Sequence, residues 1–280
     1  MAIITFWNSR REETGKTLSL AAIATYMSIE HNVKNLIIST TDREDKLKRC
    51  FWEEKKKSRF NLGIFGPNAN NILEKESGVN GLVKMIRSNK VTPDIITNYT
   101  KVVFKDRLEV LLGCEQPGKE DIMQAYPDII LSADQAYEYV FVDLDYHLPV
   151  EVRQKILEKS DIVIMNLSQR LSSLEAFLKK KEQDPLLKSS KTLLLIGRYD
   201  KFSKYNSKNI TRYLGEKNQI LTIPYNTLFF EAAEEAGIPD LFLRFRKFID
   251  PEDRNAFFIN EIKRVSENII YRLQMIQSGM

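Results

Sequence analysis

The chain has 280 residues, 43% of them hydrophobic, and a formal net charge of +4. That length can bury a core of its own, and every apolar run is shorter than the roughly 18 to 20 residues of a membrane-spanning helix. These totals exclude a helical membrane protein, and without a cleavage signature we expect a cytoplasmic one. The mild positive charge permits weak contact with nucleic acid or anionic lipid but requires neither.

Seven apolar stretches rich in β-favouring residues recur along the chain. Most are continuous rather than alternating, which is typical of strands covered on both faces. They span residues 3–7, 36–39, 108–112, 139–142, 162–166, 192–196 and 219–223.

Helical patterns separate these stretches. They cover residues 18–30, 81–88, 150–158, 171–182 and 207–214, and the segment 43–100 is interpreted as surface connection with short helices. Alternating strands and helices indicate an α/β fold, a doubly wound and mostly parallel sheet of about seven strands with helices on both faces. We predict that residues 1–250 form one such domain.

The end of the chain, residues 251–280, is predicted to be a single amphipathic helix beginning near Pro251. Its apolar residues recur at spacings of three and four: Phe258, Ile262, Val265, Ile269, Leu273 and Ile276. Such a stripe fits three surfaces, namely the domain itself, a partner subunit or a membrane surface.

A phosphate loop is predicted between the first strand and the first helix, where the chain reads Arg-Glu-Glu-Thr-Gly-Lys-Thr from Arg11 to Thr17. The first N–H groups of a helix and its dipole favour an anion at this place. Lys16 would add a positive charge, and the Thr17 hydroxyl would face Mg²⁺. Glu12 and Glu13 occupy positions where backbone alone should face the phosphate.

A carboxylate, Asp143, directly ends the buried stretch 139–142. Ligands of open parallel sheets bind at the carboxyl ends of strands, and an aspartate there can hold the metal ion of a phosphate-transfer site. The alternative is that Asp143 only caps a turn, and Asp145 is a second candidate. Asp42, soon after the second strand, is a candidate for positioning water or an ordinary helix start.

The order of these motifs resembles the ParA/MinD family of deviant-Walker P-loop ATPases (SIMIBI type) over residues 2 to about 245. The resemblance implies ATP or ADP with Mg²⁺ as cofactors and a homodimer that positions plasmids, division machinery, or pilus and secretion machinery. Among the branches, TadZ/CpaE-like proteins resemble this chain in their irregular loops. The matching segments are 3–17, 36–42, 77–82, 108–113, 137–143, 160–163 and 223–226.

The resemblance also implies roles for individual residues. Arg11 stands at the position of the family's signature lysine. Lys16, Asp42 and Asp143 would be the catalytic residues, and Thr17 and Asp143 the metal ligands. Further nucleotide contacts would come from Thr14, Gly15, Leu18, Arg198, Pro224 and Asn226.

The main departure from the family is the pair Glu12 and Glu13, which stands where two glycines are usual. Glycine supplies positive φ and close backbone approach to phosphate. A carboxylate held about 4 Å from a phosphate charge costs roughly 4 kcal/mol at an effective dielectric of about 20, whereas one directed into water costs little. The direction of these side chains therefore matters for nucleotide binding.

Two classes of function follow. The first is a slow ATPase switch that dimerises around Mg·ATP, and the second is a non-hydrolysing adaptor that keeps the fold and the dimer and recruits a protein partner or cargo. A narrower hypothesis is non-specific DNA binding, with a solvated polar surface as its alternative. The basic residues that would carry it are Lys201, Lys204, Lys208 and Arg212.

Overall fold

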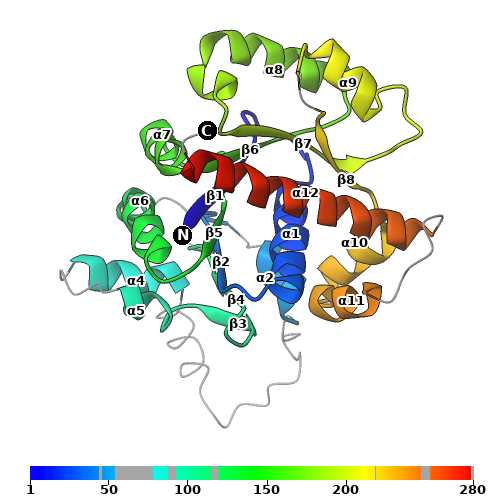
Figure 1. Cartoon of the computed structure of the whole chain (residues 1–280). Coiled ribbons are helices and arrows are strands. Elements are labelled where there is room, and N and C mark those ends of the chain that lie inside the picture. Colours follow the sequence, from blue (N-terminus) through cyan, green and yellow to red (C-terminus); the bar gives the residue numbers. More distant parts are fainter. Residues whose placement is uncertain are drawn as a thin grey trace, which may run out of the picture.

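The computed structural model describes residues 1–43, 46–53, 78–87, 93–114, 119–217, 219–246 and 253–278. An eight-stranded sheet in the order β3-β4-β2-β5-β1-β6-β7-β8 runs through the centre of the molecule (Figure 1). The strands are β1 (Ala2–Trp7), β2 (Asn35–Ser39), β3 (Lys101–Phe104), β4 (Leu108–Leu111), β5 (Tyr139–Asp143), β6 (Ile162–Leu167), β7 (Thr192–Tyr199) and β8 (Leu221–Pro224).

The sheet confirms the predicted α/β class and differs by one strand from the predicted seven. All neighbouring strands are parallel except β3, which pairs antiparallel with β4. β3 is a four-residue edge strand whose side chains are half-buried or exposed. Its sequence therefore lacks the continuous buried pattern by which the other seven strands were found.

Helices cover both faces of the sheet, and each face has its own hydrophobic core. On one face lie α1 (Lys16–Glu30), α2 (Lys46–Phe51), α10 (Thr227–Glu234), α11 (Ile238–Phe245) and α12 (Arg254–Gln277). On the other lie α4 (Gly78–Arg87), α5 (Pro93–Ile96), α6 (Glu120–Asp134), α7 (Val150–Lys159), α8 (Leu171–Gln183), the short 3₁₀ helix η1 (Pro185–Lys188) and α9 (Ser207–Tyr213).

Apart from the C-terminal helix, the individually predicted helices correspond to α1, α4, α7, α8 and α9. The short helices α2 and α5 lie in the segment 43–100, where short helices were expected, whereas α6, α10 and α11 were not predicted. The longest of the missed helices, α6, contains Pro127. An interior proline removes a helical hydrogen bond and is ordinarily read as a helix end. Much of the predicted surface connection 43–100 lies outside the described residues.

The C-terminal helix α12 packs on the domain. Its side chains contact β8 and α1, and Figure 1 shows it lying across that face of the sheet. Phe258 is fully buried and stacks near Phe229, with ring centroids 5.0 Å apart. Asp253 caps the helix through the backbone N–H groups of Asn255 and Ala256, while the predicted start, Pro251, lies outside the described residues. Five of the six residues of the apolar stripe thus belong to the core, whereas the last, Ile276, is exposed.

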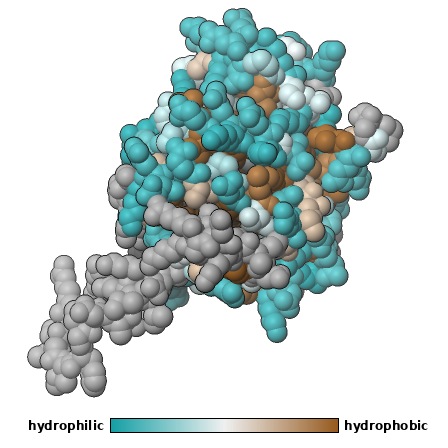
Figure 2. Space-filling view, turned by 90° about the vertical axis from the view of Figure 1, so that its left-hand side faces the viewer, coloured by the Kyte–Doolittle hydropathy of each residue, from teal (hydrophilic) through white to brown (hydrophobic). Residues whose placement is uncertain are grey.

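A helix that crosses a bilayer has to be both long and apolar. None of the described helices combines the length and the apolar composition that such a crossing requires. The side of the molecule viewed in Figure 2 is mostly hydrophilic, with hydrophobic residues in small, separate patches.

Candidate functional site

Strand order brings the predicted motifs together. β1 lies between β5 and β6, and β5 lies between β2 and β1. Asp143 at the end of β5 is in register with Phe6 of β1 and Ser39 of β2. Since β1 leads into the phosphate loop and all three strands are parallel, the loop, Asp143 and the end of β2 meet at one edge of the sheet.

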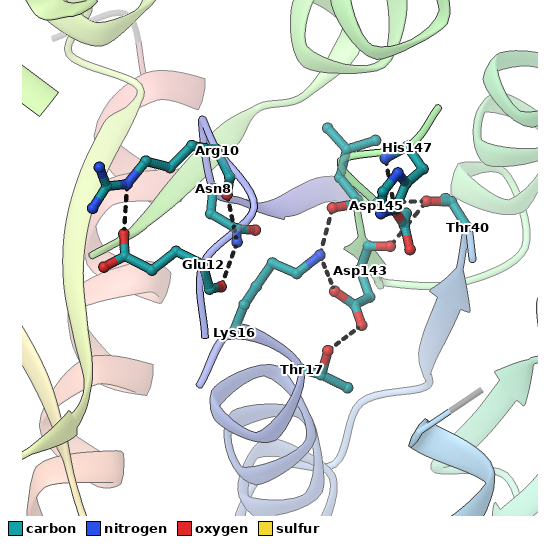
Figure 3. A network of polar contacts seen from close by, with 10 residues as sticks. Asn8, Arg10, Glu12, Lys16, Thr17, Thr40, Asp143, Asp145 and His147 are labelled. Carbon is teal, nitrogen blue, oxygen red and sulfur yellow. Dashed lines mark hydrogen bonds and ion pairs between the residues drawn. The ribbon is translucent and has the colours of Figure 1, made fainter. Parts of the chain in front are cut away.

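Lys16, Thr17 and Asp143 converge at this edge (Figure 3). Lys16 Nζ lies 2.6 Å from Asp143 Oδ1, and the Thr17 hydroxyl donates a hydrogen bond of 2.7 Å to Asp143 Oδ2. Lys16 Nζ also donates to the carbonyl oxygen of Leu144. The Asp143 side chain is about one-tenth exposed, so the pair holds opposite charges close together where water screens them weakly.

The chain after Asp143 is fixed by Thr40, which follows β2. The Thr40 hydroxyl donates to the Asp143 carbonyl oxygen at 3.0 Å and accepts from the Asp145 backbone N–H at 2.8 Å. The Asp145 carboxylate in turn accepts from the His147 backbone N–H at 2.7 Å. Asp143 and Asp145 are thereby held in defined positions beside the loop (Figure 3).

These residues border a cleft of about 740 Å³, large enough for a nucleotide-sized ligand. Predicted site residues Arg11, Lys16, Thr17 and Asp143 line it, and Arg11 is exposed there. Thr41 and Arg43 also line it, but among the described lining residues Asp42 does not occur. The Asp42 carboxylate lies 3.8 Å from the Arg43 guanidinium, and its catalytic role stays a prediction.

The Glu12 carboxylate is directed away from Lys16. It forms an ion pair of 3.0 Å with Arg10 and accepts hydrogen bonds from the hydroxyls of Ser168 at 2.6 Å and Ser173 at 2.8 Å. Burial raises the pKa of Glu12, but the hydrogen bonds from Arg10, Ser168 and Ser173 more than offset this, so its pKa lies below the ordinary value. Glu12 is therefore an anion that connects the loop to β6 and α8.

The Glu13 side chain is 81% exposed and lies 3.5 Å from the Arg198 guanidinium. Water screens so exposed a charge strongly. Both glutamates line the cleft, but the Glu12 carboxylate is paired with Arg10 and the Glu13 side chain is exposed, so neither carboxylate is paired with Lys16.

The loop backbone passes very close to β7. A Cβ atom at Gly197 would lie 2.2 Å from the Thr14 carbonyl oxygen, which only glycine avoids. Gly15 begins α1 with φ +75°, and a Cβ there would lie 3.2 Å from the Arg198 side chain. Thr14 itself is buried. Glycines at 15 and 197 therefore set the path of the loop.

Five of the residues predicted to contact the nucleotide gather beside α1 but leave little space. Gly15, Leu18, Arg198, Pro224 and Asn226 line a pocket of about 20 Å³, room for roughly one water molecule. The Asn226 amide is already used, because its Oδ1 caps α10 at the Phe229 N–H and its Nδ2 donates to Asn255. Part of a nucleotide could bind in this pocket only if the pocket widened.

Sequence reasoning missed Thr40, Ser168, Ser173 and Gly197. Thr40 and Ser168 directly follow strands at the ligand-binding edge of the sheet, and polar residues at such positions are a usable signal. Ser173 and Gly197 carried no local signal, because their roles depend on contacts with a loop distant in sequence.

Several solved structures have a similar fold. MinD complexed with Mg-ADP, from Pyrococcus horikoshii, matches with a TM-score of 0.62 and 16% identity over 96% of this chain and 95% of its own. A ParA family ATPase from Chlorobium tepidum matches with a TM-score of 0.64 and 15% identity over 97% and 98%. This chain has the MinD/ParA fold.

A third structure with the MinD/ParA fold, a protein from Borrelia burgdorferi assigned to plasmid partition and bound to AMPPNP, gives a TM-score of 0.57 and 19% identity over 98% of both chains. No protein-family model matches the sequence, and no curated protein matches it. The likeness therefore rests on the fold, and the resemblance to the TadZ/CpaE branch stays a prediction.

Proposed function

We propose that this protein binds Mg·ATP and Mg·ADP in the cleft and acts as a MinD/ParA-like dimeric switch that positions a macromolecular cargo, with slow hydrolysis. The observation that carries the proposal is the convergence of Lys16 and Thr17 on Asp143, at 2.6 and 2.7 Å, at the ligand-binding edge of this fold. Two of the similar structures hold Mg-ADP or AMPPNP.

The residues fit a magnesium ion. The Thr17 hydroxyl and the Asp143 carboxylate are hard oxygen donors, which Mg²⁺ prefers, and this ion commonly takes its other ligands from phosphates and water. The ion would neutralise phosphate charge. Lys16, released from Asp143, would bind phosphate oxygens through its ammonium group, and the N–H groups at the start of α1 would add to this binding.

Arg11 supports the dimeric form of the proposal. It is exposed on the wall of the cleft, where a guanidinium can bind a phosphate bidentately. On the resemblance, Arg11 of one subunit would reach the nucleotide of the other. Arg11→Ala should weaken nucleotide-dependent dimerisation in sedimentation velocity while leaving nucleotide binding within the monomer.

The deciding experiment is thermal unfolding with Mg·ATP and Mg·ADP. A ligand at about 100 times its dissociation constant adds roughly 2.7 kcal/mol of stability. Wild type should show this gain and Lys16→Ala should lose it. If saturating nucleotide did not change the melting temperature, the proposed nucleotide-dependent switch would be excluded.

The second candidate function is a non-hydrolysing adaptor, and the closed pocket around Asn226 favours it. An adaptor should have the same oligomeric state with and without nucleotide, and Lys16→Ala should not change that state. Sedimentation of both proteins in the presence and absence of Mg·ATP separates the two functions.

DNA as a partner rests on Lys201, Lys204, Lys208 and Arg212, all of which are exposed on α9 and the loop before it. Binding through such cations weakens steeply with salt, because it releases counterions. Affinity for random duplex that stays constant between low and physiological salt would exclude this partner.

A further inference from the structure

A second cavity, of about 630 Å³, lies between α7, the end of α8 and η1. It is separate from the cleft described above, and among the described residues none lines both. Its wall includes Trp7, the last residue of β1, as well as Arg153, Leu157, Lys180, Leu186 and Lys191.

Two buried donors on this wall have no hydrogen-bond partner. They are Trp7 Nε1 and Arg153 Nε, and Trp7 is only 3% exposed. Both groups are N–H donors, and among the described lining residues no buried acceptor is left unpaired in the same way. Both atoms are covered by neighbouring groups. Since unpaired buried donors are costly, an acceptor oxygen that reached either atom after a small side-chain movement would be stabilised.

The charge on the wall favours an anionic acceptor. Lys180 Nζ lies 4.5 Å from the centre of the Trp7 ring, and burial lowers the pKa of Lys180 against the opposing effect of Asp184. An oxyanion would offset the cost of burying the charges of Lys180 and Arg153. Lys191 is already used, because its ammonium donates to the carbonyl oxygens of Leu157, Glu158 and Ser160.

Acidic residues on the wall do not cancel this preference. Glu158 is exposed, and the Asp184 carboxylate accepts the backbone N–H of Leu186 at 3.0 Å. Neither is paired with Arg153 within the described ion pairs. The remaining wall is partly apolar, with Leu157 and Leu186.

We propose that this cavity binds a small organic oxyanion, a carboxylate or phosphate on an apolar body, through Trp7, Arg153 and Lys180. The apolar body would pack on Leu157, Leu186 and the Trp7 ring. The oxyanion would accept from the terminal nitrogens of the Arg153 guanidinium, which can hold it bidentately, and from the Lys180 ammonium. This site is additional to the nucleotide cleft and does not depend on the function proposed for it.

Trp7 provides a direct readout, because the chain has two tryptophans. In a Trp52→Phe background, Trp7 is the single indole fluorophore. Phenyl phosphate and benzoate should each be titrated, with benzyl alcohol as the neutral analogue. We expect a saturable change in fluorescence with at least one anion and none with benzyl alcohol. The anion that binds with the higher affinity shows whether the site prefers a phosphate or a carboxylate.

Three variants test whether the change in Trp7 fluorescence comes from binding in this cavity. Lys16→Ala should retain it, because Lys16 belongs to the other cleft, whereas Arg153→Gln and Lys180→Gln should each weaken binding about tenfold or more. Melting curves establish which of the two glutamine variants is folded. A tenfold loss of affinity for the anion in either folded variant supports the proposal. The proposal is overturned by any of four results: no saturable change, an equal response to benzyl alcohol, loss in Lys16→Ala, or unchanged binding in folded Arg153→Gln and Lys180→Gln.

Discussion

The hydroxyl of Ser173 donates a hydrogen bond of 2.8 Å to the carboxylate of Glu12, which joins the phosphate loop to the first turn of α8. Figure 3 shows the Glu12 side chain extending toward Arg10, on the side of the loop opposite to the Lys16 ammonium. Although Glu12 lines the cleft, its carboxylate is bound to Arg10, Ser168 and Ser173 and thus contributes to the fold of the loop.

Glu12→Ala should destabilise the protein by about 1.5 to 3 kcal/mol, because it removes charged hydrogen bonds from a side chain that is 9% exposed. Chemical denaturation measures the change. Glu13→Ala is the matched control and should stay within about 0.5 kcal/mol of wild type, since Glu13 is exposed. If Glu12→Ala instead tightened ADP binding tenfold, the carboxylate would be acting on the phosphate after all.

The stability that Glu12 contributes to the folded protein should depend on pH. Its folded-state pKa is lowered from the ordinary value of 4.5, so the stability it provides is present above pH 4.5 and is lost as pH falls through the folded-state pKa. The difference in unfolding free energy between wild type and Glu12→Gln should shrink as pH decreases below about 4.5. A difference that stays constant from pH 7 to pH 3 would contradict the ionised state assigned to Glu12.

Thr17→Val should remove the magnesium dependence of ADP binding. The valine keeps the shape of the side chain but lacks the hydroxyl that meets Asp143 at 2.7 Å. Calorimetric titration of ADP with and without Mg²⁺ should show an enhancement by the ion in wild type that falls about tenfold in Thr17→Val. Thr17→Ser retains the hydroxyl and should behave like wild type; an enhancement that survives in Thr17→Val would place the metal elsewhere.

Gly197→Ala should displace the phosphate loop. The added methyl group would meet the Thr14 carbonyl oxygen at 2.2 Å, and overpacking of this kind typically costs about 1 to 3 kcal/mol. Gly237→Ala is the control, because its nearest contacts are 3.5 Å away and its φ is −96°; it should change stability by less than about 1 kcal/mol. Equal stability of the two variants would show that the loop does not pack on β7 as described.

Local patterns in the sequence were sufficient to predict most strands of the sheet and to single out the residues at the centre of the candidate site. Seven strands were predicted because most are continuous apolar runs. Lys16 and Thr17 were singled out by the Gly-Lys-Thr sequence between a strand and a helix, and Asp143 by its place at the end of a strand. Because neighbouring strands are parallel, their carboxyl ends lie at one edge of the sheet, and this places the three residues close together. The same reasoning failed for β3, which is short and half-exposed, and for α6, which contains Pro127.

The amino-acid sequence by itself determined the fold class, and it predicted the phosphate loop and its aspartate, because these depend on the period of burial and on residue types at strand ends. Only the tertiary structure decided that Glu12 is turned to Ser168 and Ser173, that Asn226 is used as a helix cap, and that Thr14 lies against Gly197. These relationships join segments far apart in the chain, and a side chain's direction is set by the partners that packing brings to it, which no local pattern records.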